Sequence, residues 1–433
     1  MADLIRIGLA LAIIAPLTAV LIVGARVLLA DCHPSETFAY RVVSASLSLS
    51  LLGSLAVLLR FGGMAGAPVH GEVEFGDWLR IRDFVIPLVF LVDRVSVTIS
   101  LFAAGLTLLV GRFSRTYLHK EPGFVRFFVL LGLFATGTQL VALAGALEVF
   151  FAGWELVGIA SAMFIGFFHE RDEPVRSSIR AFATYRFADA GLLIATVTTF
   201  ELLGSARFSV FGQAASLPSG EASVIALLFL VSAMGKSAQL PFSGWLPRAM
   251  EGPTPSSALF YGAVSIHAGL FLLLRVWPVL EVSLLARSVG VAVGLSTAVY
   301  AAAVVRVHTD AKGALAHATL AQVGLILAEI CLGLITLALV HLVCHALLRL
   351  GQYLKAPNMI HDAHRVGHTH HRPSLLERWS PRLAARVYAA SLHRLRLDDR
   401  IDLLFAPVLT LARALNRADR RVRQALSLDG ALS

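Results

Sequence analysis

Charged residues are scarce in this sequence. Only 15% of its 433 residues are Asp, Glu, Lys or Arg, whereas 57% are hydrophobic and the mean hydropathy is +0.75. Soluble globular domains carry about 25% charged residues, so this composition excludes an ordinary soluble domain. Because a backbone in lipid must satisfy its hydrogen bonds internally, we expect an all-α polytopic membrane protein.

Cysteine is also scarce. The three residues, Cys32, Cys331 and Cys344, are far apart and form no Cys-x-x-Cys pair, so the spacing supports neither an iron–sulfur cluster nor a thiolate zinc site. The sequence also lacks a Gly-x-Gly-x-x-Gly turn, a P-loop and a His-Glu-x-x-His motif. It therefore predicts no cofactor, metal or catalytic residue in this chain, and uphill transport would draw its energy from a partner or a proton gradient.

Hydropathy predicts about eleven transmembrane helices. The first apolar stretch is too long for the core of a signal peptide, so we interpret it as a retained helix. Residues 61–84 form a polar connector between the second and third spans. The expected spans are residues 5–30, 41–60, 88–111, 126–145, 147–168, 180–203, 222–241, 256–274, 284–305, 313–333 and 335–354.

The loops after the odd-numbered spans carry most of the positive charge, as in Arg112, Arg115 and Lys120 after the third. By the positive-inside rule, the N-terminus is expected outside and the C-terminal tail in the cytoplasm, with the protein in the cell inner membrane. We assign the net charge of +9 to this bias and to a tail that faces lipid, and not to nucleic-acid binding.

Two charges interrupt spans that are otherwise apolar. Glu155 lies in the fifth expected span and Lys236 in the seventh. A lone charge at the bilayer centre costs at least about 2.5–3.5 kcal/mol, so an acid and a base in mid-span predict a buried pair. Such a pair either only ties two helices together or acts as a proton relay, in which the lysine changes its pKa as its partner changes. The relay is the favoured hypothesis, because intramembrane ionisable groups are usually functional.

Further ionisable groups occupy the later spans. Arg186 and Asp189 are three residues apart on one helix face, so they either neutralise each other or leave Asp189 to hold Lys236. Histidines titrate near neutral pH, and a row of them across a membrane is what a proton path needs. The groups that extend the predicted relay are His267, Lys312, His341 and His345, with Arg349 one turn further on.

A break in the helix is predicted beside Lys236, because Gly235 precedes it and Pro241 follows. Transporters use broken helices at mid-membrane to expose backbone groups and to admit water. Intermittent hydration at such a break is one way to move the pKa of a lysine.

The composition changes at Lys355, where the tail begins. Five histidines follow (His361, His364, His368, His370 and His371), and they belong either to a solvated linker, which we favour, or to a metal site. From residue 401 to 426, apolar residues recur at helical spacing and arginines crowd the other flank. This basic amphipathic helix is expected to lie on an anionic membrane surface or to dock on a partner.

Three stretches carry a family resemblance: residues 154–158 (WELVG), 235–241 (GKSAQLP) and 252–258 (GPTPSSA), with weaker matches at 309–312 (TDAK) and at His341 and His345. They resemble the antiporter-like proton-translocating family. This family includes the L (chain 5) subunit of respiratory complex I, the large subunits of Mrp antiporters and the B subunit of the DAB inorganic-carbon transporter. The resemblance covers roughly residues 85–354.

The resemblance implies inverted five-helix repeats, with Glu155 and Lys236 as the modulating pair. Lys312, His341 and His345 would belong to a central hydrophilic axis. The implied domains are residues 1–120 (first helices and connector), 121–355 (antiporter-like core) and 356–433 (basic cytoplasmic tail with an amphipathic helix).

The sequence also departs from the family pattern. The family's eighth-span histidine falls on Tyr261, and His267 follows nearly two turns later. In the eleventh span, this sequence has Arg349 at a position where the family has a lysine. An arginine is always charged and cannot release a proton. The chain is expected to leave the membrane after the eleventh span, so the second repeat is expected to be truncated, without the later broken helix and its exit lysine and without a long lateral helix.

The short chain and its tail resemble most the DAB-type B subunit. This resemblance implies a proton- or cation-conducting subunit that drives a large zinc-containing, carbonic-anhydrase-like partner, which converts carbon dioxide to bicarbonate and docks on the tail. Zinc is expected in that partner only. The alternatives are a subunit of complex I or of an Mrp antiporter, with other membrane subunits as partners, and a structural membrane anchor.

Overall fold

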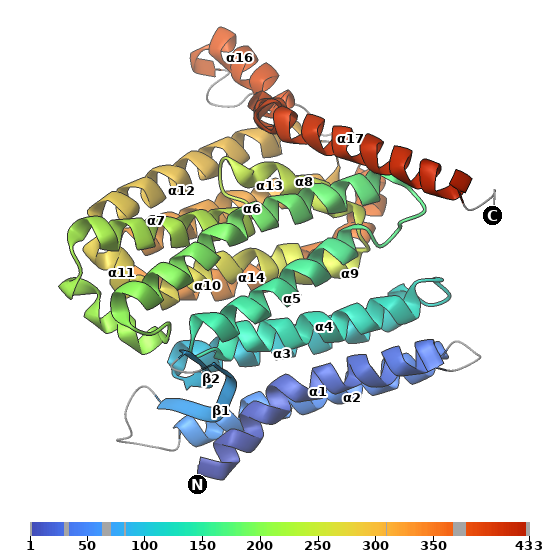
Figure 1. The fold of residues 1–433 in the computed structure, drawn as a ribbon. Coiled ribbons are helices and arrows are strands. Elements are labelled where there is room, and N and C mark those ends of the chain that lie inside the picture. Colours follow the sequence, from blue (N-terminus) through green and yellow to red (C-terminus); the bar gives the residue numbers. More distant parts are fainter. Residues whose placement is uncertain are drawn as a thin grey trace. The chain divides into compact units, whose positions relative to one another are not determined.

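The computed structural model describes residues 2–29, 34–62, 71–81, 84–308, 310–366 and 378–429. The chain divides into two compact units, Met1–His370 and His371–Ser433, which are described separately below. The first unit consists of long helices that follow one another along the chain, with one β-hairpin near its start (Figure 1).

Ten helical segments of the described chain are long and apolar enough to cross a membrane. They correspond to α1 (Ala2–Leu29), α2 (Glu36–Gly62), α3 (Arg94–Tyr117), α4 (Phe124–Leu143), α5 (Leu147–Ile165), α7 (Ser219–Lys236), the interrupted helix Thr254–Arg275, α12 (Leu284–Val304), α13 (Ala311–Cys331) and α14 (Ile335–Val366). The prediction of an all-α polytopic membrane fold is confirmed.

The remaining expected span, the sixth at residues 180–203, is α6 (Asp172–Leu203), which is long but is not one of these ten. Arg186 and Asp189 lie inside it and lower its mean hydropathy. Its exposed residues nevertheless include Leu193, Ile194 and Val197, and apolar side chains on an outer face are what a helix in lipid requires. α6 packs between α5 and α7, and its Arg186 pairs with Glu155 of α5 and with Asp189.

Close packing of the helices depends on small residues. A Cβ atom on Gly137 of α4 would lie 3.0 Å from the carbonyl oxygen of Gly153 on α5, and a Cβ atom on Gly153 would lie 2.8 Å from the carbonyl oxygen of Gly137. Small residues at such crossings let helix backbones approach closely in a membrane. The α4–α5 crossing therefore fixes the helix that carries Glu155.

The predicted start of the third span at residue 88 is wrong, because a β-hairpin begins within the predicted connector at residues 61–84 and continues to Val92. β1 (Gly71–Ile81) and β2 (Phe84–Val92) form an antiparallel hairpin, and α3 begins only at Arg94. A short run rich in Val, Phe and Ile fits a buried strand as well as a helix. Asp93 ends the strand, because its side chain accepts a hydrogen bond from the Ser96 N–H and caps α3.

A buried ion pair joins the start of α3 to the end of α10 (Ala268–Arg275). Arg275 Nη1 and Nη2 lie 2.5 and 3.1 Å from the two carboxylate oxygens of Asp93, and both side chains are 6% exposed. Burial by itself would raise the pKa of Asp93, but the Arg275 guanidinium and the Ser96 hydrogen bonds outweigh it and hold that pKa below its usual value. The pair therefore stays charged and ties the two helix ends together.

The hairpin is fastened to the helices through the turn between α4 and α5. The Gly145 N–H donates to the Val89 carbonyl at 2.9 Å, and the Gly145 carbonyl accepts from the Phe208 N–H at 2.9 Å. Arg207 adds ion pairs to Glu72 at 3.0 Å and Glu74 at 2.6 Å. β2, the α4–α5 turn and the start of the 3₁₀ segment Phe208–Ser216 are thus held as one unit.

Gly145→Ala is expected to destabilise this junction. The new Cβ would lie 2.6 Å from Val89 Cγ1 and 3.0 Å from the Val89 backbone, so the strand must shift, at a cost of about 1–3 kcal/mol. Thermal unfolding of the purified protein in detergent measures the loss. Gly105→Ala is the matched control, because its Cβ meets nothing within 4 Å. Equal unfolding temperatures for the two variants would contradict this account of the junction.

The second unit consists of α16 (Pro381–Leu392) and α17 (Leu397–Asp429), joined by a short turn. The amphipathic helix begins at Leu397, slightly earlier than the periodicity indicates. Its apolar residues Leu411, Leu415 and Val422 are exposed within the unit. Whether membrane or partner covers them stays a prediction.

The histidine-rich linker falls largely outside the described residues. α14 continues to Val366, beyond the expected change at Lys355, and its backbone includes His361 and His364. The side chains of these two residues, and His368, His370 and His371 altogether, lie outside the described part of the chain.

Candidate functional site

α7 ends at Lys236, and the chain then continues through short turns. Ala238 adopts φ +53°, and after Pro241 the 3₁₀ turn Phe242–Gly244 leads into α8 (Trp245–Arg248). A helix end leaves backbone carbonyls without partners. Here the Trp245 indole donates to the Gly235 carbonyl at 3.0 Å, which satisfies one of them. The structure therefore places a break directly after the lysine.

The Lys236 ammonium is enclosed by aromatic rings and a carbonyl. The residue is 1% exposed, and Nζ donates to the Trp154 carbonyl oxygen at 3.1 Å. Nζ also lies 4.7 Å from the ring centre of Trp154 and 4.8 Å from that of Tyr185, where the electron-rich faces attract a cation. Among the described residues, Lys236 makes no direct ion pair with a carboxylate. Glu155 and Lys236, the predicted pair, thus interact without a direct salt bridge between them.

Arg186 is the direct partner of both acids, the half-buried Glu155 and the buried Asp189. Its Nη1 contacts Glu155 Oε2, and its Nη2 lies 2.7 Å from Asp189 Oδ2. The other Asp189 oxygen accepts a hydrogen bond from the Trp154 indole. The two interpretations of Asp189 are therefore linked: it neutralises Arg186 directly, and it reaches the Lys236 cage through Trp154.

The cluster contains two acids and two bases, so its formal charge is zero. Side-chain exposure falls from 36% at Arg186 and 18% at Glu155 to 4% at Asp189. Arg186 and Glu155 thus form the outer end of the cluster and Lys236 the closed inner end. The bridging role of Arg186 was missed from the sequence, because no spacing rule relates residues on two different helices.

Gly158→Ala is expected to disturb Lys236. A Cβ atom at this position would lie 2.9 Å from Lys236 Nζ and 3.4 Å from an Arg186 nitrogen, so the ammonium must leave its place. Because proton transfer depends on precise placement, we expect transport to fall at least about tenfold.

Proton flux into vesicles that contain the purified protein, with its partners if any co-purify, measures this effect. Gly351→Ala is the control, because its Cβ meets nothing within 4 Å. Wild-type flux in Gly158→Ala would show that the place of the ammonium does not matter.

A second cluster joins α14 to the interrupted eighth span. His345 Nδ1 lies 3.0 Å from His267 Nε2, and His345 Nε2 accepts from Arg349 Nε at 3.1 Å. His267 Nδ1 donates to the Ala263 carbonyl at 2.8 Å. A guanidinium only donates and a carbonyl only accepts, so each of these three hydrogen bonds has its donor on the Arg349 side and its acceptor on the Ala263 side. Each imidazole ring therefore donates once and accepts once, and both rings are neutral.

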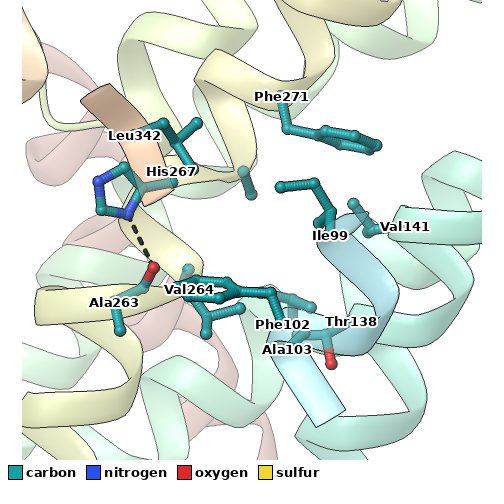
Figure 2. Close-up of a pocket in the computed structure, with 13 residues that line it drawn as sticks. Ile99, Phe102, Ala103, Thr138, Val141, Ala263, Val264, His267, Phe271 and Leu342 are labelled. Carbon is teal, nitrogen blue, oxygen red and sulfur yellow. Dashed lines mark hydrogen bonds between the residues drawn. The ribbon is translucent and has the colours of Figure 1, made fainter. Parts of the chain in front are cut away.

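Ala263 ends a π-helical turn, Ser257–Ala263, and such turns often occur at functional sites. Figure 2 shows the His267 ring hydrogen-bonded to the Ala263 carbonyl, with Phe102 and Phe271 among the residues that line a cavity. The volume of the cavity is about 40 Å³. This volume can hold a water molecule, but the lining is mostly apolar and offers few polar partners.

His341 lies next to this chain, with its ring centre 6.3 Å from that of His345. Its Nδ1 lies 2.9 Å from Glu329 Oε1, and its Nε2 lies 3.0 Å from Gln322 Oε1. His341 of α14 thus contacts a carboxylate and an amide of α13 through its two ring nitrogens. Gln322 and Glu329 were missed, although two polar residues seven apart in an apolar helix are a usable signal.

Two serines lie between the clusters. Ser161, one turn after Gly158 on α5, has its hydroxyl oxygen 3.3 Å from that of Ser265, which precedes His267 by two residues. This contact joins α5, which carries Gly158 beside Lys236, to the segment that carries His267.

Lys312 lies apart from both clusters. Its ammonium donates to the carbonyls of Met250 at 3.3 Å and Gly252 at 3.1 Å, at the N-terminal end of α13. Glu329, the partner of His341, is 17 residues further along this helix, which corresponds to about 26 Å. The structure brings His267, His341 and His345 together, but it does not bring Lys312 to them.

This fold and this row of intramembrane charges define a class: multi-pass helical membrane proteins with an ionisable interior. The transmembrane family described as NADH:quinone oxidoreductase/Mrp antiporter matches residues 144–386, more than half of the chain. The family described as NADH-ubiquinone oxidoreductase (complex I), chain 5 N-terminus, matches residues 78–128. The chain belongs to the NADH:quinone oxidoreductase/Mrp antiporter family, which confirms the resemblance seen in the sequence.

Similar proteins come from three kinds of assembly. NAD(P)H-quinone oxidoreductase chain 5 of Picosynechococcus sp. is 32% identical over 339 residues, covering 76% of this chain and 51% of that protein. The probable inorganic carbon transporter subunit DabB1 of Halothiobacillus neapolitanus is 35% identical over 289 residues, covering 65% and 52%. The structure of the Mrp complex from Dietzia sp. has a TM-score of 0.68 and 24% identity, covers 87% of this chain and 39% of that chain, and shows the fold. The chain spans about half the length of the curated relatives it matches.

Proposed function

We propose that this chain is a proton-conducting membrane subunit, in which the Arg186 bridge controls the charge of Lys236. The observation that carries the proposal is the position of Lys236: it is fully buried, it lacks a direct acid partner among the described residues, and it lies beside two acids that share one arginine. A fixed structural pair would place an acid directly on the lysine, because unpaired buried charge is costly.

The first step follows from the electrostatics of the bridge. When Glu155 takes up a proton, it no longer attracts Arg186, which then pairs fully with Asp189. The negative field of Asp189 at Lys236 is then cancelled, so burial disfavours the ammonium and the lysine releases its proton. Loss of the Glu155 proton restores the first arrangement.

The released proton has acceptors on the far side of Ser161 and Ser265. His267 is neutral, and its Nε2 is the nitrogen that can accept. Protonation of that nitrogen breaks its hydrogen bond to His345, which can then turn towards His341 and Glu329. The direction of the hydrogen bonds thus lets the two hydrogen-bonded histidines take up one proton at a time.

Lys236→Ala tests this proposal. With the complete protein and its co-purifying partners in vesicles, we expect proton flux to fall to the level of empty vesicles, because no other described residue replaces the ammonium in its cage. Lys355→Ala, an exposed lysine near the end of α14, is expected to conduct like wild type. Wild-type flux in Lys236→Ala would instead favour a structural membrane anchor.

We further propose that the subunit serves inorganic carbon transport, together with a large zinc-containing, carbonic-anhydrase-like partner. The 35% identity to the Halothiobacillus carbon-transporter subunit supports this assignment. The quinone oxidoreductase and Mrp relatives support the alternative, a subunit of one of those complexes. We place the protein in the cell inner membrane, with the N-terminus outside and the partner docked on the cytoplasmic tail.

Purification of the tagged chain in mild detergent separates these assignments. A large stoichiometric partner with bound zinc is expected for the carbon transporter. Removal of residues 378–433 is expected to release that partner without loss of the membrane helices. A set of respiratory or small antiporter subunits without zinc would contradict the carbon-transport assignment and leave proton conduction untouched.

A further inference from the structure

A second pair of histidines lies at the start of α13, and the proposed path does not use it. His308 precedes α13, and His317 lies in its second turn; their ring centres are 4.4 Å apart and the planes are tilted by 32°. Burial increases inwards: the side chain of Asp310 is 63% exposed, that of His308 is 12% exposed, and His317 is fully buried. Asp310 Oδ2 lies 3.4 Å from His308 Nδ1.

The local sequence fixes this arrangement. Asp310 caps α13 by accepting the Gly313 N–H at 2.6 Å. Gly313 leaves room for the first ring, because a Cβ atom there would lie 2.9 Å from His308 Nδ1. The Gly313 carbonyl accepts from His317 Nδ1 at 2.9 Å, so a neutral His317 carries its proton on Nδ1 and accepts on Nε2.

The ring contact limits the pair to a single added proton. A charged imidazole is attracted by the face of a neutral one, whereas two charged rings would repel each other. Other titratable groups adjoin this site. Lys312 of α13 interacts with Asp310, Glu251 and Arg171, and Tyr353 of α14 interacts with Asp310. The ring of Tyr300 on α12 lies 6.4 Å from that of His317. Asp310 lies in direct ion-pair reach of the His308 ring.

We propose that His308 and His317, with the exposed Asp310 at the entrance, form a site that takes up protons from the water on the Asp310 side of the membrane. A proton from bulk water binds the Asp310 carboxylate and passes to His308 Nδ1, which restores the carboxylate. After rotation of the His308 ring, a proton passes from His308 to His317 Nε2, so His308 becomes neutral again and His317 becomes the imidazolium. This inference rests on the proposed proton conduction and adds an uptake site to it.

Two conservative variants test the site. His317→Asn keeps a donor for the Gly313 carbonyl but cannot carry a proton, and His308→Gln removes the half-buried relay without touching the core. In vesicles that contain the complete protein and its co-purifying partners, each is expected to slow proton flux at least about tenfold, the low end for loss of a positioned proton-transfer group. His169→Gln, an exposed histidine in the α5–α6 loop, is the matched control and is expected to conduct like wild type.

The outcomes distinguish this inference from the proposed function. If Lys236→Ala stops the flux while both histidine variants conduct like wild type, the loading site is wrong and proton conduction stands. If Lys236→Ala has no effect, the proposed function itself fails. Infrared difference spectra of wild type against the double variant provide a readout without transport: uptake of a single proton by the pair on acidification is expected, and its absence would overturn the site.

Discussion

The cost of charge in a membrane interior governs this structure. Each buried ionisable group has to be compensated where it lies, since water cannot reach it. The protein uses two kinds of compensation. Asp93 and Arg275 form a closed pair at a helix junction, which is well suited to holding helices together. Lys236 instead contacts a carbonyl and two aromatic faces. Glu155 and Asp189 do not contact it directly, so the charge of Lys236 can be controlled through the groups between them.

Arg186 is the movable element in this arrangement. One guanidinium serves two carboxylates, so a change in the charge of Glu155 alters what Asp189 can offer to the Trp154–Lys236 cage. On the far side of the two serines, the hydrogen bonds of Arg349, His345 and His267 all run one way. The first cluster thus couples charges across helices, and the second imposes an order on proton transfer.

The sequence predicted the helices and the central charges, because both depend on local composition. An apolar run of span length and a lone charge within it are visible without any tertiary information. The partners were not visible: Arg186 reaches Glu155, and His267 reaches His345, across helices whose rotation is set by packing. The hairpin was missed because residues 84–92 satisfy strand and helix patterns equally, and the capping role of Asp93 decides where the helix begins.

The second histidine pair illustrates the same limit. His308 lies beside a stretch that resembles the family, and His317 is a histidine within an apolar span, yet neither position alone indicates a pair. Their contact depends on Gly313, whose missing side chain makes the space for one ring. Geometry of this kind follows from one small residue at one helix turn, which composition and periodicity do not reveal.

The most direct test of the account is the proton flux of Glu155→Gln in vesicles. The amide imitates a permanently protonated Glu155, so Arg186 should remain on Asp189 and Lys236 should stay unable to recover its proton. The account predicts that flux stops although the protein folds and Lys236 is intact. Flux equal to that of wild type would show that the charge of Glu155 does not control Lys236, and would contradict the central claim.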